Sequence, residues 1–312
     1  MKIIMYHYIH DKYSRIPYQY YLDITDFRKQ LDYLENQYGF LPKEMFIEYI
    51  RQGFIPTDEH RVVLTFDDGL KDHYHFVFPE LKKRNLWGIF FISTNILSDS
   101  EHLLDVHKLH IILSNKIGTE KLKLQLSKFL TNNLTNNLKT DKFPELYKYQ
   151  QNPSDTLMVK KIINYYLPLS EKKIILNQTL SELGILETEM AQYYYLSAEE
   201  IKELYNNNML VGSHTQSHNV LSNLSMKEQK QEIIMSYDLI TSLLGTKDFI
   251  PFSFPYGREG TFNKNSLTIL EQSKYSCAFM VKHSDIHGDI RNTYISLPRW
   301  DCNQFPFGKS KF

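Results

Sequence analysis

Short apolar runs recur along the chain, and each is bounded by polar or turn-forming residues. Strands that are buried on both faces of a parallel sheet read as continuous apolar runs rather than as alternating ones. The runs IIMY, RVVLTF, GIFFIS, NMLVGS, FIPFSF and SCAFMV have this character. They predict core strands at residues 3–6, 61–66, 88–93, 208–213, 249–254 and 276–281.

Helical patterns lie between these runs. Residues 25–38 have apolar positions at helical spacing. Ser197 with Glu200, and Ser225 with Glu228, have the spacing of a capping box, so a helix is expected to begin after each serine. Strands that alternate with helices predict an α/β fold built on a parallel sheet or barrel. The residues of the first helix that share one face are Phe27, Leu31, Leu34 and Tyr38.

One long segment interrupts this alternation. Residues 99–195 are rich in Lys, Asn, Leu and Glu and contain almost no strand-like runs. Helical periodicity is visible in residues 106–118 and 171–186, and the Asn-rich TNNLTNNL between them predicts a loop or a frayed helix. We therefore expect one unit formed by residues 1–98 and 196–312. The helical insertion is expected to be a lid or a substrate-specificity subdomain.

Charge and composition narrow the classes of partner. The chain of 312 residues has 36 basic and 36 acidic side chains, and this balance argues against a nucleic acid or an anionic membrane as the partner. No stretch approaches the roughly 18 apolar residues of a membrane-spanning helix. The opening MKIIMYHYIH is too short in apolar residues for a secretory signal, which favours a cytoplasmic protein. Nothing in the sequence sets the oligomeric state.

The two cysteines, Cys277 and Cys302, do not have the spacing of metal ligands. Because a cytoplasmic chain is kept reduced, both are expected to be free thiols. A single disulfide is the alternative.

Polar motifs follow the ends of three predicted strands. Asp67 and Asp68 come directly after RVVLTF, GSHTQSH covers residues 212–218, and FSFPYG covers residues 252–257. The carboxyl ends of the strands are where α/β folds place their sites. Taken alone, however, a DDG turn is more often ordinary turn chemistry, and a PYG turn is weak evidence.

The second motif has the spacing of metal ligands. His214 and His218 are four residues apart, so one turn of helix would aim both imidazoles the same way. With one carboxylate they form a donor set suited to a divalent metal, first Zn²⁺, with Co²⁺, Ni²⁺, Fe²⁺ or Mn²⁺ as alternatives. Two ordinary surface or core histidines are the other reading. In the third motif, Pro255 and Gly257 force a turn whose backbone N–H groups could hold an oxyanion.

Together and in this order, TFDDG, SHTQSH and FPYG resemble the polysaccharide deacetylase family, also called carbohydrate esterase family 4. The resemblance implies a deformed (β/α)7-type barrel, here with a large helical insertion. It also implies a divalent metal that helps water to remove N-acetyl or O-acetyl groups from sugars. Position by position, Asp67 would be the general base, Asp68, His214 and His218 the metal ligands, and the backbone N–H of Tyr256 the oxyanion donor.

The general acid departs from the commonest family pattern, because the C-terminal LxxH motif is absent after Leu297. The opening IMYHYI resembles the MYH motif of a circularly rearranged branch, which includes deacetylases of poly-N-acetylglucosamine. This resemblance nominates His7 as the acid. The alternative is a histidine that packs at the end of the first strand. The weaker candidates are His10, His73, His75, His283 and His287.

A second departure is Ser253, which stands where many members carry an arginine that orients the base. The late run LPRWD resembles the LPR segment of the rearranged branch, so Arg299 is the candidate to hold Asp67 ionised through a charge-assisted hydrogen bond. An ordinary surface ion pair is the alternative for Arg299. Trp300 and Asp301 are candidates to line the same wall, although core packing explains the tryptophan equally well.

The resemblance covers residues 1–98 and 196–303 and implies a metal-dependent N-deacetylase. The expected substrate is an acetylated amino sugar that is nucleotide-linked, lipid-linked or polymeric. A deformylase or an O-acetyl esterase acting on a sugar would use closely related chemistry. The same centre would serve a hydrolase of non-sugar amides, since the ligand set reports the reaction more clearly than the substrate. A catalytically silent glycan-binding protein is the alternative from a different class.

Overall fold

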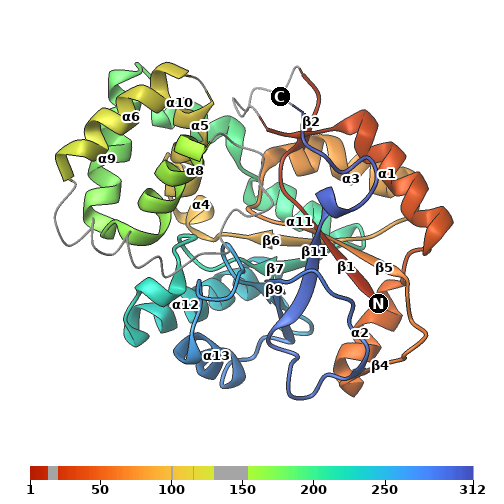
Figure 1. Ribbon diagram of the computed structural model, residues 1–312. Coiled ribbons are helices and arrows are strands. Elements are labelled where there is room, and N and C mark those ends of the chain that lie inside the picture. Colours follow the sequence, from red (N-terminus) through yellow and green to blue (C-terminus); the bar gives the residue numbers. More distant parts are fainter. Residues whose placement is uncertain (13–19, 100, 115, 130–153, 312) are drawn as a thin grey trace. The chain divides into compact units, whose positions relative to one another are not determined.

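The chain forms two compact units in a computed structural model (Figure 1). The barrel unit comprises Met1–Arg15, Tyr20–Ser98 and Tyr194–Phe312, and the insertion unit comprises Ile16–Gln19 and Asp99–Tyr193. The residues that the structure describes are 1–12, 20–99, 101–114, 116–129 and 154–311.

Parallel strands close into a barrel in the barrel unit. Their order around the barrel is β1-β5-β6-β7-β8-β9-β11, which is also their order along the chain, and β11 pairs with β1 to close the ring. This confirms the predicted (β/α)7-type barrel. The strands are β1 (Lys2–Tyr6), β5 (Val62–Phe66), β6 (Ile89–Ile92), β7 (Leu210–Ser213), β8 (Pro251–Ser253), β9 (Cys277–Val281) and β11 (Leu297–Asp301).

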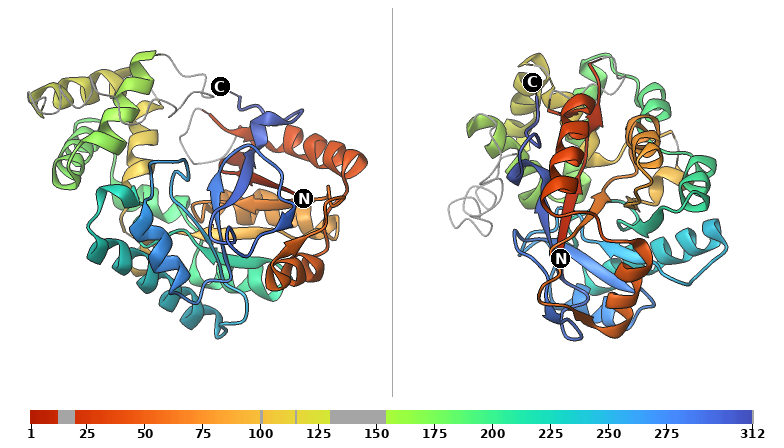
Figure 2. Two further views of the ribbon diagram at one scale, coloured as in Figure 1. Left: turned by 60° about the horizontal axis from the view of Figure 1, so that its bottom comes forward. Right: turned by 90° about the vertical axis from the view of Figure 1, so that its right-hand side faces the viewer.

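Helices pack around the outside of these strands, as two further views of the ribbon show (Figure 2). Both predicted capping boxes are present, because Ser197 and Glu200, and likewise Ser225 and Glu228, exchange hydrogen bonds between side chain and backbone. The helices of the barrel unit include α1 (Ile24–Gln37), α2 (Lys43–Gln52), α3 (Phe78–Lys83), α4 (Asn95–Ser98), α11 (Ala198–Asn206), α12 (Met226–Leu244) and α13 (Lys264–Glu271).

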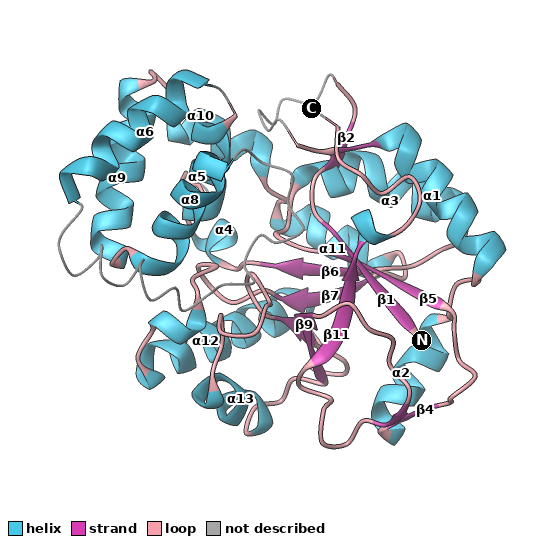
Figure 3. Ribbon diagram, viewed as in Figure 1, coloured by secondary structure: helices cyan, strands magenta, loops and turns pink. Residues whose placement is uncertain are grey.

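The connection from β9 to β11 contains no α-helix, although every residue in it is described. Its short strand β10 (Gly288–Asp289) pairs instead with β4 (Phe54–Ile55) (Figure 3). The Trp300 ring stacks on His283 with centroids 5.6 Å apart, and its indole N–H donates to Asp285 at 2.9 Å. Because side chains alternate along a strand, Trp300 and Arg299 face opposite sides of β11. Trp300 therefore packs under this connection.

The C-terminal segment is held by one buried glutamine. The side-chain amide of Gln30 donates to the carbonyl oxygens of Cys302 at 3.0 Å and Pro306 at 2.9 Å, and it accepts from the Tyr6 hydroxyl at 2.7 Å. Cys277 and Cys302 are both free, as predicted.

The insertion unit is helical over its described residues. The segments with helical periodicity, 106–118 and 171–186, are helical over residues 106–113, 116–118 and 171–182, whereas TNNLTNNL at 131–138 lies outside the described residues. Inside the unit, the buried ammonium of Lys108 pairs with Glu187 at 2.8 Å. Its helices include α5 (Asp105–Leu113), α6 (Lys116–Phe129), α8 (Ser154–Lys161), η2 (Ile162–Tyr166), α9 (Leu169–Glu182) and α10 (Glu187–Tyr194), which ends one residue beyond the unit. Within the described part of the chain, no helix is long and apolar enough to cross a membrane.

Candidate metal centre and active site

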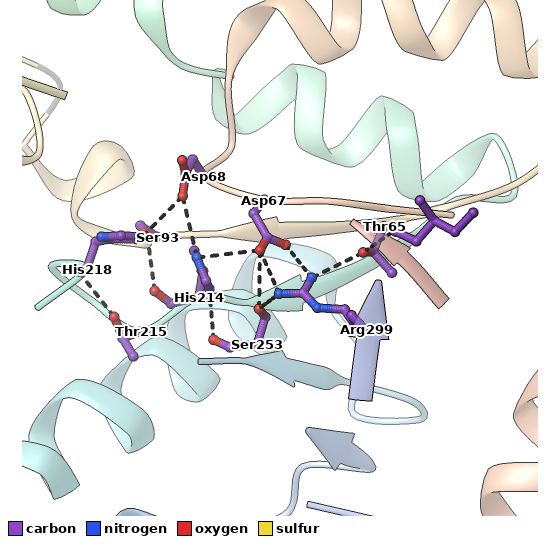
Figure 4. Close-up of polar contacts among 10 residues, drawn as sticks. Thr65, Asp67, Asp68, Ser93, His214, Thr215, His218, Ser253 and Arg299 are labelled. Atoms are coloured by element: carbon purple, nitrogen blue, oxygen red, sulfur yellow. Dashed lines mark hydrogen bonds and ion pairs between the residues drawn. The ribbon is translucent and has the colours of Figure 1, made fainter. Parts of the chain in front are cut away.

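The polar motifs converge at the carboxyl ends of the barrel strands (Figure 4). Asp67 and Asp68 follow β5, His214 follows β7, and Arg299 projects from β11. Their side chains are almost completely buried, and so is that of His218. Charged residues that are far apart in the sequence therefore lie close together, because parallel strands bring their carboxyl ends to the same edge.

Both histidine nitrogens lie at the spacing from the Asp68 carboxylate that two ligands of one metal ion have. Nε2 of His214 lies 3.4 Å from Oδ1 of Asp68, and Nε2 of His218 lies 3.3 Å from the same oxygen. Tetrahedral zinc, with bonds of about 2.0–2.1 Å, holds its ligand atoms about 3.3–3.4 Å apart. These residues form the group of potential ligands found among the described residues. The donor set and its spacing both fit a divalent metal.

A hydrogen bond behind His214 orients its ring. Nδ1 of His214 lies 2.8 Å from the backbone carbonyl oxygen of Ser253. Since a carbonyl only accepts, Nδ1 carries the proton, and the lone pair of Nε2 points toward Asp68. Such a partner on the second ring nitrogen is typical of metal-bound histidines.

The loop that joins the two histidines differs from the sequence prediction. The predicted helical turn is wrong, because Thr215 and His218 adopt left-handed φ angles of 63° and 57°. The N–H groups of Thr94 and Asn95 donate across to the carbonyl oxygens of Thr215, at 3.0 Å, and Gln216, at 2.8 Å. These bonds to the turn between β6 and α4 replace the hydrogen bonds of a helix. The rings still converge, with centroids 4.8 Å apart.

Backbone strain also marks the other two motifs. Asp68 has a φ of 78° and Tyr256 a φ of 62°. A bulky residue with a positive φ costs of order 1–3 kcal/mol and is typical of functional sites. The Tyr256 ring lies 4.9 Å from the His218 ring between centroids, so the FPYG turn borders the candidate metal ligands.

Asp67 is held by a buried arginine from β11. The guanidinium of Arg299 donates to both carboxylate oxygens of Asp67 at 2.7 Å, and also to the hydroxyls of Ser253 at 2.7 Å and Thr65 at 3.1 Å. Arg299 is completely buried, so this is no surface ion pair. Burial alone would raise the pKa of Asp67, but the guanidinium of Arg299 outweighs burial and lowers the pKa.

His7 follows β1, the strand beside β5. The backbone N–H of Asp67 donates to the carbonyl oxygen of Tyr6 at 3.0 Å, so His7 and Asp67 leave neighbouring strands together. The His7 side chain is half-buried. This position places His7 at the same end of the barrel as the candidate metal ligands.

Another histidine supports this position from behind. Nε2 of the completely buried His73 lies 2.6 Å from the backbone carbonyl oxygen of His7. Burial lowers the pKa of His73 to about 4, so the ring is neutral at neutral pH and donates to that carbonyl. His73 therefore fixes the main chain at His7 and does not act as a general acid at neutral pH. Among the other weak candidates, His10 stacks on Tyr21, His283 stacks on Trp300, and His75 and His287 are exposed.

Residues 176–278 match the polysaccharide deacetylase family. The match spans His214, His218 and the FPYG turn, and the closed barrel agrees with the fold that the family predicts. This match, which covers about a third of the chain, and the barrel together make the chain similar to the polysaccharide deacetylase family. Among curated protein sequences, none matches the chain.

Solved structures of polysaccharide deacetylases and related proteins share this fold. The Streptococcus pyogenes deacetylase PplD, in complex with acetate, is 18% identical over 96% of this chain and 91% of its own, with a TM-score of 0.56. IcaB from Ammonifex degensii is 17% identical over 96% of this chain and 89% of its own, with a TM-score of 0.55. The de-N-acetylase from Aggregatibacter actinomycetemcomitans is 14% identical over 96% and 93%, with a TM-score of 0.52.

Two residues of the candidate site have no role predicted from the sequence. Thr65 contacts the Arg299 guanidinium, and its position two residues before Asp67 on a strand places both on one face. Glu232 contacts the loop between the histidines but lies on α12, fourteen residues beyond His218. No local pattern reports such a contact, because it depends on how the helix packs on the barrel.

Proposed function

We propose that the protein is a metal-dependent N-deacetylase that acts on an acetylated amino sugar. The match of residues 176–278 to the polysaccharide deacetylase family supports a carbohydrate deacetylase. The observation that carries the finer proposal is the convergence of His214 and His218 on Asp68, beside a second carboxylate that an arginine holds. This combination supplies both a metal site and a separate base.

Asp68, His214 and His218 would hold the metal, with Zn²⁺ as the first candidate and Co²⁺, Ni²⁺, Fe²⁺ or Mn²⁺ as alternatives. When bound, a divalent metal lowers the pKa of water and polarises the acetyl carbonyl group. All of the proposed site residues lie in the barrel unit. We therefore assign the insertion unit to substrate selection rather than to the chemistry.

Asp67 acts as the general base. Arg299 keeps its carboxylate ionised and fixes its orientation, so that it can take the proton from the attacking water. The water oxygen bonds to the acetyl carbon, and the backbone N–H of Tyr256 donates to the oxyanion that develops on the carbonyl oxygen. The C–N bond then breaks, which gives acetate and the amino sugar.

His7 would protonate the leaving nitrogen. Replacing His7 with glutamine is expected to lower kcat for amide hydrolysis by about 10²–10⁴-fold, because an amine anion cannot depart without a proton. For an aryl acetate the variant's kcat should fall much less, because a phenolate can leave without being protonated. The two rates are compared at equal metal content. Equal losses on both substrates would show that His7 does not act as the acid.

The substrate class is tested by measuring the acetate or formate released by zinc-loaded protein. The panel holds polymeric, nucleotide-linked and lipid-linked acetamido sugars, their N-formyl and O-acetyl counterparts, and simple acetamides without a sugar. We expect acetate and free amine in equal amounts from at least one acetamido sugar. Release from O-acetyl sugars alone would indicate an esterase. A metal-loaded chain that binds these sugars without releasing acetate would be a catalytically silent binding protein.

A further inference from the structure

A carboxylate on α12 grips the loop that carries both candidate histidine ligands. Oε2 of Glu232 accepts the backbone N–H of Gln216 at 2.9 Å and that of Ser217 at 2.8 Å. Its other oxygen accepts the Ser217 hydroxyl. One side chain therefore binds two consecutive amides and a hydroxyl midway between His214 and His218. Hydrogen bonds of this kind, to an ionised acceptor, are about twice as strong as neutral ones.

The gripped loop is under strain and is held from two directions. Its carbonyl groups at Thr215 and Gln216 accept from the turn between β6 and α4, while its N–H groups at Gln216 and Ser217 donate to Glu232. Thr215 and His218 both adopt left-handed φ angles. Such conformations cost of order 1–3 kcal/mol each and persist only where the surroundings fix them. The hydrogen bonds from Glu232 are among the contacts that hold the loop in this conformation.

The helix that carries Glu232 is itself anchored to the strand that leads into the loop. The hydroxyl of Ser213, the last residue of β7, donates to the hydroxyl of Ser236 at 2.7 Å. Ser236 lies one turn after Glu232 on α12, so both face the same side of the helix. The hydroxyl of Ser236 also contacts that of Tyr275 at 3.0 Å. The carboxylate is therefore presented from a fixed position.

We propose that Glu232 is a positioning residue that pre-organises His214 and His218 for metal binding, an inference that rests on the proposed metal centre. Without it, the loop would relax from its left-handed conformations, and the metal would have to restore them. Removing groups that orient metal ligands typically costs 10–100-fold in metal affinity. Glutamine removes the negative charge and leaves only neutral hydrogen bonds to the loop, because its carbonyl oxygen can accept the two amides while its –NH2 group faces the Ser217 hydroxyl.

The test compares Glu232→Gln with Asp238→Asn, which removes a carboxylate from an exposed position on the same helix. Amide exchange of Gln216 and Ser217 is followed by NMR in the metal-free protein. The zinc dissociation constant is then measured by competition with a chromophoric chelator. We expect faster exchange at both amides and about 10–100-fold weaker zinc binding for Glu232→Gln. Asp238→Asn should match the wild type, and Glu232→Asp, which keeps the charge on a shorter arm, should fall between.

Unchanged exchange at Gln216 and Ser217 in Glu232→Gln would overturn the inference. Faster exchange with unchanged zinc affinity would also overturn it, because the hydrogen bonds to Glu232 would then not affect metal binding. A wild-type chain that binds no zinc would instead overturn the proposed metal centre. The exchange rates are measured without metal, so they separate the two failures.

Discussion

Replacing Asp67 with asparagine is expected to lower kcat for acetate release by about 10²–10⁴-fold. Asparagine keeps the shape of the side chain and can still accept a hydrogen bond from Arg299, but it cannot take a proton from water. Zinc binding should persist, because Asp67 is not among the three proposed ligands. The measurement is kcat at saturating substrate, with zinc occupancy and thermal unfolding recorded for both proteins.

A matched control is Asp289→Asn, which neutralises an exposed carboxylate that is also paired with an arginine, Arg291. Its activity should equal that of the wild type. If Asp67→Asn stayed within tenfold of the wild type at equal zinc occupancy, Asp67 would not be the base.

Replacing Arg299 with methionine is expected to destabilise the fold by about 3–5 kcal/mol at neutral pH. The guanidinium and the Asp67 carboxylate are both buried, so removing one leaves the other as an uncompensated charge. Arg291→Met removes an equally short but exposed pair with Asp289, and it should change stability by no more than about 0.5 kcal/mol. Urea unfolding at neutral pH measures both values.

The same substitution should change how stability depends on pH. In the wild type the pKa of Asp67 is lowered, so the pair stabilises the fold above the ordinary carboxyl pKa and loses this effect as the pH falls through the lowered value. Without Arg299, burial would raise the pKa of Asp67, and the variant would lose stability as the pH rises. The difference in the free energy of unfolding between the wild type and Arg299→Met should therefore become smaller as the pH falls. A loss below about 1 kcal/mol that does not vary with pH would contradict the buried pair.

Much of the barrel is predictable because each core strand but one is a continuous apolar run. The exception is β11, whose sequence LPRWD combines a proline, an arginine and an aspartate. Its arginine faces the interior because Asp67 neutralises it there, and that pairing joins residues 232 positions apart. No periodicity reports an interior cation. Resemblance to a family nominated Arg299 where pattern alone could not.

The site was predictable to the level of residues and less so to the level of conformation. Motifs at strand ends meet because the barrel gathers those ends, so Asp68, His214 and His218 could be grouped from the sequence. The spacing of the two histidines, by contrast, fits a helical turn and a strained loop equally well. Hydrogen bonds to the turn after β6 and to Glu232 decide between them, and neither partner is part of the loop's own sequence motif.

The most direct test of the account is to restore zinc to protein stripped by a chelator while acetate release from an acetamido sugar is followed. We expect activity to return in proportion to zinc and to saturate at one zinc per chain. His218→Ala should need far more zinc or stay inactive. Full acetate release by the stripped protein, or the same zinc dependence in His218→Ala and the wild type, would contradict a metal centre at Asp68, His214 and His218.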